Sequence, residues 1–548
     1  MPSKSAIAVW SVVVGLYCLH AASYGAWIVD DAAISFAYAR NLAAGHGPAA
    51  QPGVVPVEGF SNALWVLLLA LFDAVNAFDP VLTPKLASGA MTAVALVLVW
   101  RTVARDGQGP AFAASLACIA AACNPALVIW SMSGLENGML VFGTVVMFTM
   151  TRRVFAEGAT RSAAVAAGVV AALLAFVRPD GALWCAAWPV AASSRAGTQR
   201  TARPAIVVFL LTAGLLGLLG EGIRYRTFGD VVPNTFHVKQ SAGFGGLVAA
   251  LVVVPSLVVV LRGIGAHIAA WPERRRWTAG YMLAAACALL LAATSGRSLF
   301  RSVFGWLDVV AGAVLLLGWS AWRSPGPAMR AAVLCATIAA TAYCALPKDW
   351  MGEYRFATVF VPFGTLVAFG LAAEWCGPDA RRRWITGAIA AALLLPNYCV
   401  RWSRFRRQPT VPVTLVAADH APFERYREVL GGSRSLLTED VGAPLLYSSL
   451  RIHDLGGLCE PILGRTLFRD PARLADHVFD ALRPDFVRLS GDIAIRCGLQ
   501  EDARFRRDYV AVREWTSDRA PGVPLGHFVR KDALHDDVLL RLRSIVPR

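Results

Sequence analysis

Two adjacent carboxylates, Asp30 and Asp31, stand where the first apolar segment of the chain ends. Neighbouring carboxylates at such a boundary repel each other and cost desolvation free energy unless other groups partner them. A carboxylate beside a substrate hydroxyl can take its proton, which is general-base catalysis. An acidic helix end in contact with water is the structural alternative for the same two residues.

Four later segments also combine acids, cations, amides and aromatic side chains. Their sequences are SGLEN at 133–137, RPDG at 178–181, RYRTFGDVVPNTFHVKQ at 224–240 and DWMGEYR at 349–355. Cations bind phosphate, carboxylates take protons from hydroxyls, and aromatic rings stack on sugar faces. Together these residues fit an anionic, hydroxyl-rich ligand carried on a lipid. Each segment alone is weaker, because helix caps, local ion pairs, interfacial aromatics and lipid-anchoring cations use the same residue types.

The composition places these residues in a polytopic membrane protein. The chain has 548 residues, of which 56% are hydrophobic and 16% charged, and its mean hydropathy is +0.52. Its formal charge of +15 comes from Lys and Arg between apolar segments, which is typical of cytoplasmic loops. No basic stripe is interleaved with exposed aromatic residues, so the sequence argues against nucleic-acid binding. The bilayer itself is therefore an expected partner.

Charge sign predicts how the candidate residues are gathered. Arg-rich connections at 101–105, 152–161, 195–203, 262–276, 323–330 and 381–383 alternate with the acidic or mixed ones described above. With the Arg-rich set inside, the other set lies outside together with Asp30 and Asp31, and about thirteen spans result. We expect these spans at 7–29, 86–101, 111–130, 137–151, 162–177, 182–193, 205–221, 246–262, 278–294, 304–320, 328–346, 356–374 and 383–399.

This transmembrane domain covers residues 1–400, and its first outer loop covers 30–85. The apolar run at 63–78 is predicted to be a helix packed at the outer interface, because crossing would break the alternation. The run at 182–193 is short for a span, and its flanking charges are the reason for including it. The N-terminus is predicted inside the cell and the C-terminus outside.

Residues 401–548 are predicted to form a separate soluble α/β domain on the outer side. They contain 20 of the 37 acidic residues. Strand-length apolar runs at 411–418, 435–438, 443–447 and 509–512 alternate with helical patterns at 421–430 and 471–482. The chain has no CxxC or Cys/His metal spacing, but Cys459 and Cys497 lie in this domain, where an oxidising compartment would permit a disulfide.

The motifs resemble those of a known class of membrane enzymes. The strings DDAAISFAYARNLAAGHG and VEGFSNALW, followed in order by SGLEN, RPDG, FGDVVPNTFHVK, DWMGEYRF and EDVGAPLLYSSLRIHDLGGL, resemble polyprenyl-phosphate-sugar-dependent glycosyltransferases of the GT-C class. More closely, they resemble the AftB family of mycobacterial arabinofuranosyltransferases, over about residues 26–465. Ala33 and Asn137 depart from that family's usual residues, which leaves the sugar and the acceptor open.

The resemblance implies a GT-C fold and a catalytic aspartate on the first outer loop, at Asp30 with Asp31 beside it. Asp30 would take the proton of an acceptor hydroxyl that displaces a lipid phosphate from the anomeric carbon of a sugar. Predicted ligands of the donor phosphate are Arg178, Arg224, Lys239 and Arg355. Predicted sugar and acceptor contacts are Arg40, Glu58, Asn62, Glu136, Asn234, His237, Trp350 and Tyr354.

Metal dependence stays open, since Asp31 and Glu136 could orient donor hydroxyls or hold a divalent cation through oxygen ligands. The predicted partners are a polyprenyl-phosphate sugar and a glycan acceptor at the outer face of the cytoplasmic membrane. Two other functions compete: a transporter or flippase of polyprenyl-linked glycans, and a polymerase or ligase of the O-antigen type. A transporter would favour ionisable residues in mid-membrane and repeated halves, whereas here they lie mostly at span ends.

The alternation of charge can be tested by thiol labelling of sealed cells. We expect His46→Cys to react with a membrane-impermeant thiol reagent added outside, because residue 46 lies on the predicted outer loop. Thr198→Cys is expected to stay unlabelled until the membrane is permeabilised. Labelling of Thr198→Cys in intact cells would contradict the alternation and the single outer face.

Overall fold

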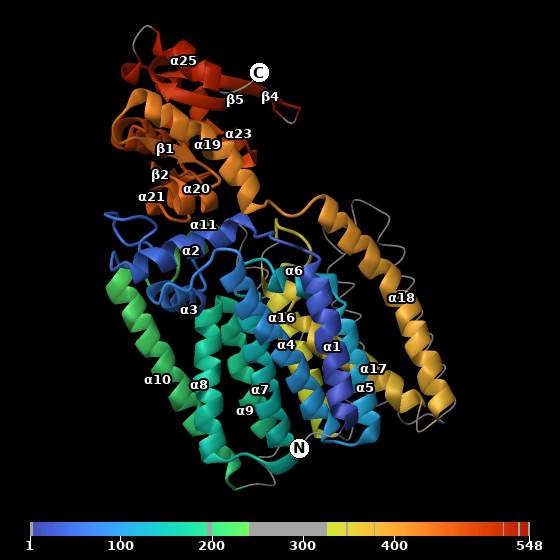
Figure 1. The fold of residues 1–548 in the computed structure, drawn as a ribbon. Helices are drawn as coiled ribbons and strands as arrows, with labels where there is room; N and C mark the ends of the chain where they lie inside the picture. The colour runs from blue at the N-terminus through green and yellow to red at the C-terminus, as the bar shows by residue number, and fades with distance from the viewer. Residues whose placement is uncertain are drawn as a thin grey trace.

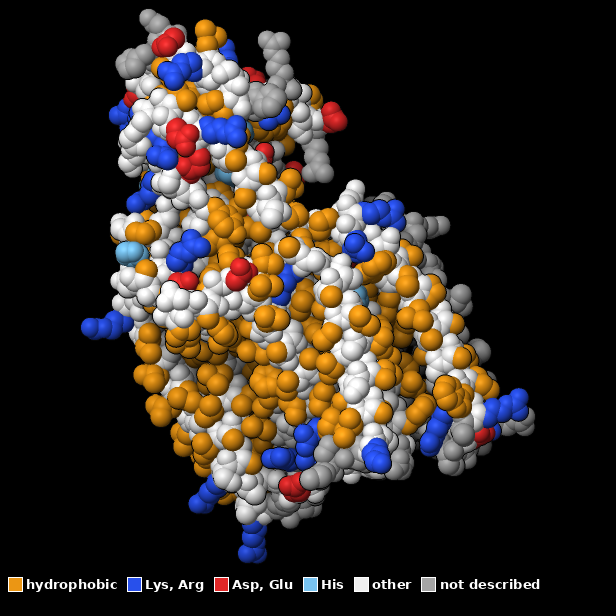
Figure 2. Space-filling view, viewed as in Figure 1, with side chains coloured by type: hydrophobic (Ala, Val, Ile, Leu, Met, Phe, Trp, Pro, Cys, Tyr) orange, Lys and Arg blue, Asp and Glu red, His pale blue; other side chains and the backbone are white. Residues whose placement is uncertain are grey.

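A bundle of apolar helices carries a small α/β domain at one end (Figure 1). This computed structural model describes residues 4–193, 200–239, 326–346, 349–376, 379–518, 520–534 and 537–545. The N-terminus lies at the end of the bundle far from the C-terminal domain. Hydrophobic side chains cover the visible face of the bundle, and Lys and Arg side chains gather at its far end (Figure 2). The mainly helical architecture agrees with the predicted class.

The long elements of the bundle run between its two ends, and short helices lie among them. The elements are α1 (Lys4–Ala22), α4 (Leu82–Ala104), α5 (Gln108–Ala122), α6 (Pro125–Ser131), α7 (Asn137–Glu157), α8 (Arg161–Val177), η1 (Pro179–Ala186), α9 (Ala187–Ser193), α10 (Ala202–Phe228), α16 (Pro327–Ala345), η3 (Arg355–Ala357), α17 (Phe360–Cys376) and α18 (Ala380–Arg407).

Among the described residues, four helices are long and apolar enough to cross a membrane: α1, α4, α7 and α10. The pair α5 and α6, bent by 60°, makes a fifth candidate. Predicted spans at 246–262, 278–294 and 304–320 lie outside the described residues, so the count of thirteen stays a prediction.

Two predicted spans differ from the described helices. The segment at 182–193 is divided between the 3-10 helix η1 and the seven-residue α9, so it forms no long helix. The first span, predicted to reach residue 29, ends as α1 at Ala22. The chain then turns at Gly25, whose φ is +57°.

Small residues allow the bundle helices to approach closely. Gly138 on α7 faces the backbone of Ser88 on α4, and Gly168 on α8 faces the Phe209 carbonyl and Thr212 on α10. Without a side chain at these points, backbones can pack by van der Waals contact, which is how apolar helices associate in lipid.

Two helices lie across the end of the bundle that faces the C-terminal domain: α2 (Asp30–Ala43) and α3 (Ala63–Ala74) (Figure 1). The short helix α11 (Asn234–Lys239) lies at the same end. At 12 residues, α3 is about 18 Å long, which is too short to cross a membrane. The prediction that 63–78 forms a non-crossing helix is therefore consistent with the structure.

The C-terminal domain is built on a five-stranded mixed sheet of order β2-β1-β3-β5-β4. β1 pairs in parallel with β2 and β3, whereas β5 pairs antiparallel with β3 and β4. Its elements are α19 (Val413–Leu430), β1 (Ser435–Thr438), α20 (Gly442–Tyr447), β2 (Arg451–Asp454), α21 (Pro461–Thr466), α22 (Pro471–Asp476), η4 (His477–Leu482), β3 (Phe486–Leu489), α23 (Asp492–Cys497), η5 (Leu499–Glu501), α24 (Ala503–Asp508), β4 (Tyr509–Ser517), β5 (Ala520–Arg530), η6 (Lys531–Ala533) and α25 (Val538–Ile545).

Two of the four predicted strands in this domain are wrong. The runs at 435–438 and 509–512 do form strands, but 411–418 mostly belongs to α19 and 443–447 belongs to α20. In α19 the buried positions 413, 416, 420 and 423 recur at helical spacing, a period that the β-branched residues at its start concealed. The predicted helical patterns at 421–430 and 471–482 are confirmed by α19, α22 and η4.

One hydrophobic core runs from the bundle into α19 and α20, and a second fills the opposite side of the sheet. Cys459 packs against the first core and Cys497 lies in the second. Both thiols are free, so the disulfide that the sequence permits is not formed.

Close helix packing can be tested with two glycines on α7. A Cβ at residue 138 would overlap the Ser88 backbone, whereas a Cβ at residue 143 would meet only the flexible end of Leu174, at 2.8 Å. We expect Gly138→Ala to lower the free energy of unfolding by about 1–3 kcal/mol and Gly143→Ala to leave it nearly unchanged. Thermal unfolding in detergent measures both, and equal midpoints would contradict the packing described.

Candidate active site between the bundle and the C-terminal domain

The main chain before α2 is held by the segment that enters the C-terminal domain. Val29 forms an isolated antiparallel bridge with Pro412. The Asp30 N–H donates to the Val411 carbonyl at 3.0 Å, and the Val413 N–H donates to the Ile28 carbonyl at 2.9 Å. This pairing fixes where α2 begins, and the first turn of α2 then presents both Asp30 and Asp31.

The Asp30 carboxylate is buried and bound by two peptide groups of the C-terminal domain. Only 5% of the surface of Asp30 is exposed to solvent. Oδ2 accepts the Gly442 N–H at 3.0 Å and Oδ1 accepts the Ala443 N–H at 2.8 Å. A Cβ at residue 442 would overlap the Asp30 carbonyl oxygen and lie 2.7 Å from its Cγ. Glycine is therefore required here by the closeness of the two chains.

The surroundings of Asp30 place its pKa near neutrality. Burial raises the pKa of the Asp30 carboxyl to about 7. The hydrogen bonds from the two peptide N–H groups have the opposite effect and lower this pKa. The negative charges of Asp31 and Asp440 raise this pKa further. Asp31 is half-buried beside it. A carboxyl group with this pKa is ionised in a large fraction of molecules at pH 7 and can still be protonated, as a general base requires.

A second group of charged residues, the buried charge network, lies at the same end of the bundle. It consists of Glu136, Arg178, Asp180, Asp349 and Arg355. Arg178 contacts Asp180 at 2.9 Å and Glu136 at 3.7 Å, and Arg355 contacts Asp349 at 3.0 Å. The motifs SGLEN, RPDG and DWMGEYR therefore meet, as the single-face hypothesis requires.

Neutral residues complete the buried charge network. Asn62 donates to Glu136 Oε2 at 2.8 Å and accepts from the Ser35 hydroxyl of α2 at 3.2 Å. The guanidinium groups of Arg178 and Arg355 lie 4.7 and 4.5 Å from the ring centre of Phe356. Because each arginine already has a carboxylate partner, neither is an unpaired cation for a phosphate. Their predicted role as phosphate ligands has no support in these contacts.

A third group, the loop cluster, joins the outer loop to α10, α11 and the C-terminal domain. Glu58 accepts from Arg224 Nε at 2.8 Å, and Arg224 also contacts Glu221. Burial raises the pKa of Glu58 to about 7, while Arg224 lowers it. The Asn234 side chain donates to the carbonyls of Gly457 and Leu458, at 2.8 Å each. This cluster ties the domain to the bundle at a second point.

The remaining predicted residues lie at the edge of these groups. His237 contacts Asp230 at 2.7 Å, and Arg40 donates to the Leu446 carbonyl at 2.8 Å. Trp350 is 64% exposed. The ring of Tyr354 lies 4.2 Å from the Arg401 guanidinium. Lys239 ends α11, and its side chain is outside the described part of the structure.

Sequence reasoning missed the groups that bind Asp30, because they are peptide N–H groups. Gly442 and Ala443 lie in the motif EDVGAPLL, but neither residue type carries a polar side chain. The preceding Asp440 was missed as a neighbouring charge. A motif shows that these residues are neighbours in the sequence. Their contact with Asp30, which lies 412 and 413 positions earlier in the chain, is seen only in the folded structure.

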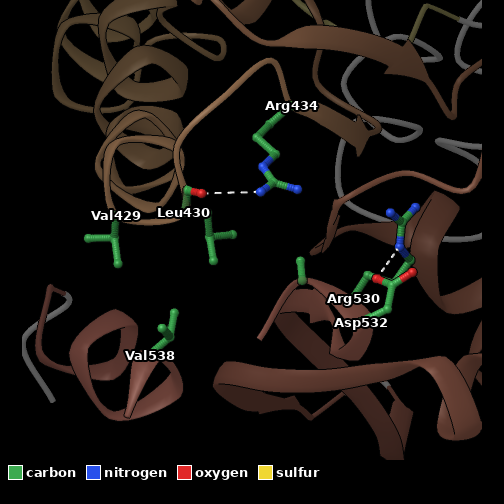
Figure 3. A pocket seen from close by; sticks show the side chains of 7 residues that line it. Val429, Leu430, Arg434, Arg530, Asp532 and Val538 are labelled. Carbon is green, nitrogen blue, oxygen red and sulfur yellow. Dashed lines mark hydrogen bonds and ion pairs between the residues drawn. The ribbon is translucent and has the colours of Figure 1, made fainter. Parts of the chain in front are cut away.

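Other parts of the described chain offer no second centre. No group of three or more His, Cys, Asp or Glu side chains within the described ranges could hold a metal ion. A cavity of about 280 Å³ in the C-terminal domain is lined by Val429, Leu430, Arg434, Arg530, Asp532, Ala533 and Val538 (Figure 3). Arg434 donates there to the Leu430 carbonyl and Arg530 to Asp532, so both cations have partners.

Comparison with known proteins identifies the fold. No protein-family model matches the chain, and no curated protein matches it. Among solved structures, the crystal structure of the Archaeoglobus fulgidus oligosaccharyltransferase in complex with Zn and sulfate is similar, with a TM-score of 0.52 and 14% sequence identity. The match covers 87% of this chain and 67% of that chain. The chain is therefore similar in fold to that oligosaccharyltransferase.

The buried charge network predicts a stability effect that depends on burial. Arg178→Met removes the positive charge and leaves Glu136 and Asp180 buried without it, which costs about 3–5 kcal/mol. Arg504→Met is the matched control, because Arg504 contacts three carboxylates at the surface of the C-terminal domain. We expect a much smaller loss for Arg504→Met, where water screens the charges. Equal losses in thermal unfolding would contradict this difference.

Proposed function

We propose that the chain is a membrane glycosyltransferase that moves a single sugar, with arabinofuranose as one candidate, from a polyprenyl phosphate to a glycan acceptor. The observation that carries this proposal is the buried carboxylate of Asp30, with a pKa near 7, at the first residue of α2. The GT-C fold supports the reaction class. The proposed location is the cytoplasmic membrane, with the C-terminal domain on its outer side.

In the proposed reaction, Asp30 removes the proton of an acceptor hydroxyl as its oxygen attacks the anomeric carbon of the donor sugar. The new bond joins that oxygen to the carbon, and the bond between the carbon and the phosphate oxygen breaks. The lipid phosphate leaves with the bonding electrons. Because the acceptor oxygen attacks from the opposite face of the sugar, the configuration at the carbon is inverted. Each carboxylate oxygen of Asp30 accepts one peptide N–H and keeps a second lone pair for the hydroxyl proton.

The leaving phosphate needs positive charge that is fixed before the reaction. Arg178 and Arg355 are paired with buried carboxylates, so we assign them to holding the site together. Arg224 is also paired, with Glu58 and with the partly exposed Glu221, and a phosphate would have to replace Glu221 there. Arg224 and Lys239 remain the proposed phosphate ligands on this basis, because they lie at the loop cluster beside the first outer loop. Arg40, Trp350 and Tyr354 are proposed contacts of the sugar or acceptor on the accessible surface.

Asp31 and Glu136 are the residues that would hold a divalent cation. Glu136 is bound by Asn62 and Arg178. The mechanism proposed here is written with the protein's own charges.

A second candidate is transfer of a whole glycan from the lipid carrier. It is favoured by the similarity in fold to an oligosaccharyltransferase. Matched polyprenyl donors that carry one sugar or several sugars distinguish the two candidates, because only the accepted length yields product.

The test of the proposed function is Asp30→Asn. An amide has almost no basicity, so we expect transfer in purified membranes to fall by roughly two to four orders of magnitude while donor binding persists. In the unaltered protein, transfer should fall as pH is lowered through about 7, because protonated Asp30 cannot accept the hydroxyl proton. Radiolabelled donors at several pH values measure both effects.

Asp454→Asn is the matched control. Asp454 is buried, its two oxygens accept the N–H groups of Gly457 and Cys459 at 3.0 and 2.8 Å, and burial raises its pKa to about 7. It lies at the end of β2, and both of its N–H donors come from the loop that follows that strand. We expect the folded Asp454→Asn protein to keep the unaltered transfer rate. Nearly unaltered transfer by Asp30→Asn would refute Asp30 as the base and make Asp31 the next candidate.

A further inference from the structure

We propose that the C-terminal domain supplies positioning groups for the candidate base: the peptide N–H groups of Gly442 and Ala443 orient the Asp30 carboxylate, so the base is complete only when this domain is docked. The inference rests on the proposed function. It adds a requirement that the fold alone does not imply: residues of the C-terminal domain, more than 400 positions after Asp30 in the sequence, are part of the catalytic arrangement.

The geometry of the contact is specific. One N–H binds each carboxylate oxygen, at 3.0 and 2.8 Å, so rotation of the carboxylate would lose both hydrogen bonds. The absence of a side chain at Gly442 lets its backbone reach the Asp30 carbonyl and Cγ. The contact therefore fixes both the position of the carboxylate and the direction of its free lone pairs.

Independent contacts dock the domain at this point. Trp27 Nε1 donates to the Thr410 carbonyl at 2.8 Å, next to the pairing of residues 28–30 with 411–413. The Trp27 ring also packs edge-on against Trp130 and Phe405. Loosening this segment would move Gly442 and Ala443 relative to Asp30 without any change at the carboxylate.

The charges around Asp30 explain why the two peptide groups matter. Asp31 on α2 and Asp440 before α20 both face Asp30 with negative charge, and Arg488 contacts Asp440 at 3.0 Å. The peptide N–H groups of Gly442 and Ala443 oppose the effects of burial and of the two acids. Without these donors, the pKa of Asp30 would rise further and a smaller fraction of the carboxylate would be ionised at neutral pH.

The experiment compares the unaltered protein with Gly442→Ala and Trp27→Phe, and uses Gly387→Ala as the control. A Cβ at residue 387 meets only Leu116 Cδ2, at an ordinary 3.9 Å. The first readout is hydrogen exchange of the peptide 440–446, measured by mass spectrometry in detergent. We expect faster exchange at residues 442 and 443 in Gly442→Ala and Trp27→Phe, and no change in Gly387→Ala.

The second readout is the pH profile of sugar transfer. In Gly442→Ala the acid limb should move to higher pH by about one unit, with roughly fivefold lower transfer at pH 7 and recovery at higher pH. Trp27→Phe should move the limb in the same direction by less. A merely structural role would lower transfer at all pH values without moving the limb, and that result would overturn the proposal.

The two hypotheses can fail separately. If the unaltered protein transfers no sugar, the proposed function fails, and unchanged exchange at 442 and 443 in Asp30→Ala would then also refute the contact itself. If Gly442→Ala does not fold, Trp27→Phe decides the question, because it adds no atoms beside Asp30. An unmoved acid limb in a folded Trp27→Phe protein with accelerated exchange would refute the positioning role.

Discussion

The contact between the Asp30 carboxylate and two peptide groups of α20 is the constraint on which the rest of the site depends. Burial of an ionised carboxylate costs several kcal/mol, whereas hydrogen bonds to a charged group contribute about 1.5–3 kcal/mol each. Two such bonds are thus of the size needed to keep Asp30 buried and ionisable. The bundle provides the carboxylate and the C-terminal domain provides the donors, so neither part makes the site alone.

The buried charge network limits what the other polar residues can do. Three carboxylates pair with two guanidinium groups at the same end of the bundle, with Phe356 against both arginines. A donor phosphate would have to compete with these carboxylates for Arg178 or Arg355. The network therefore joins the loops around α2 to one another through charge pairs and hydrogen bonds.

Residue types and charge sign predicted the convergence of the polar motifs better than they predicted local structure. Glu136, Arg178 and Arg355 do meet, since Arg178 pairs with Glu136 and both arginines lie against Phe356. The sequence could not pair Asn62 with Glu136 or arginines with particular carboxylates, since these contacts join separate loops. It also mistook 443–447 for a strand, and so missed the helix whose first peptide groups bind Asp30.

Asp30 and Asp454 have the same chemistry but differ in what controls them. Each is a buried carboxylate that accepts two peptide N–H groups, and burial raises the pKa of each to about 7. The donors to Asp454 come from residues three and five positions away, so local folding alone establishes its environment. The donors to Asp30 lie 412 and 413 positions away, on a domain joined to the bundle by α18 and the segment at 408–412. At Asp30, unlike at Asp454, movement of the C-terminal domain would change the protonation of the carboxylate, so binding of an acceptor to that domain would be coupled to proton transfer.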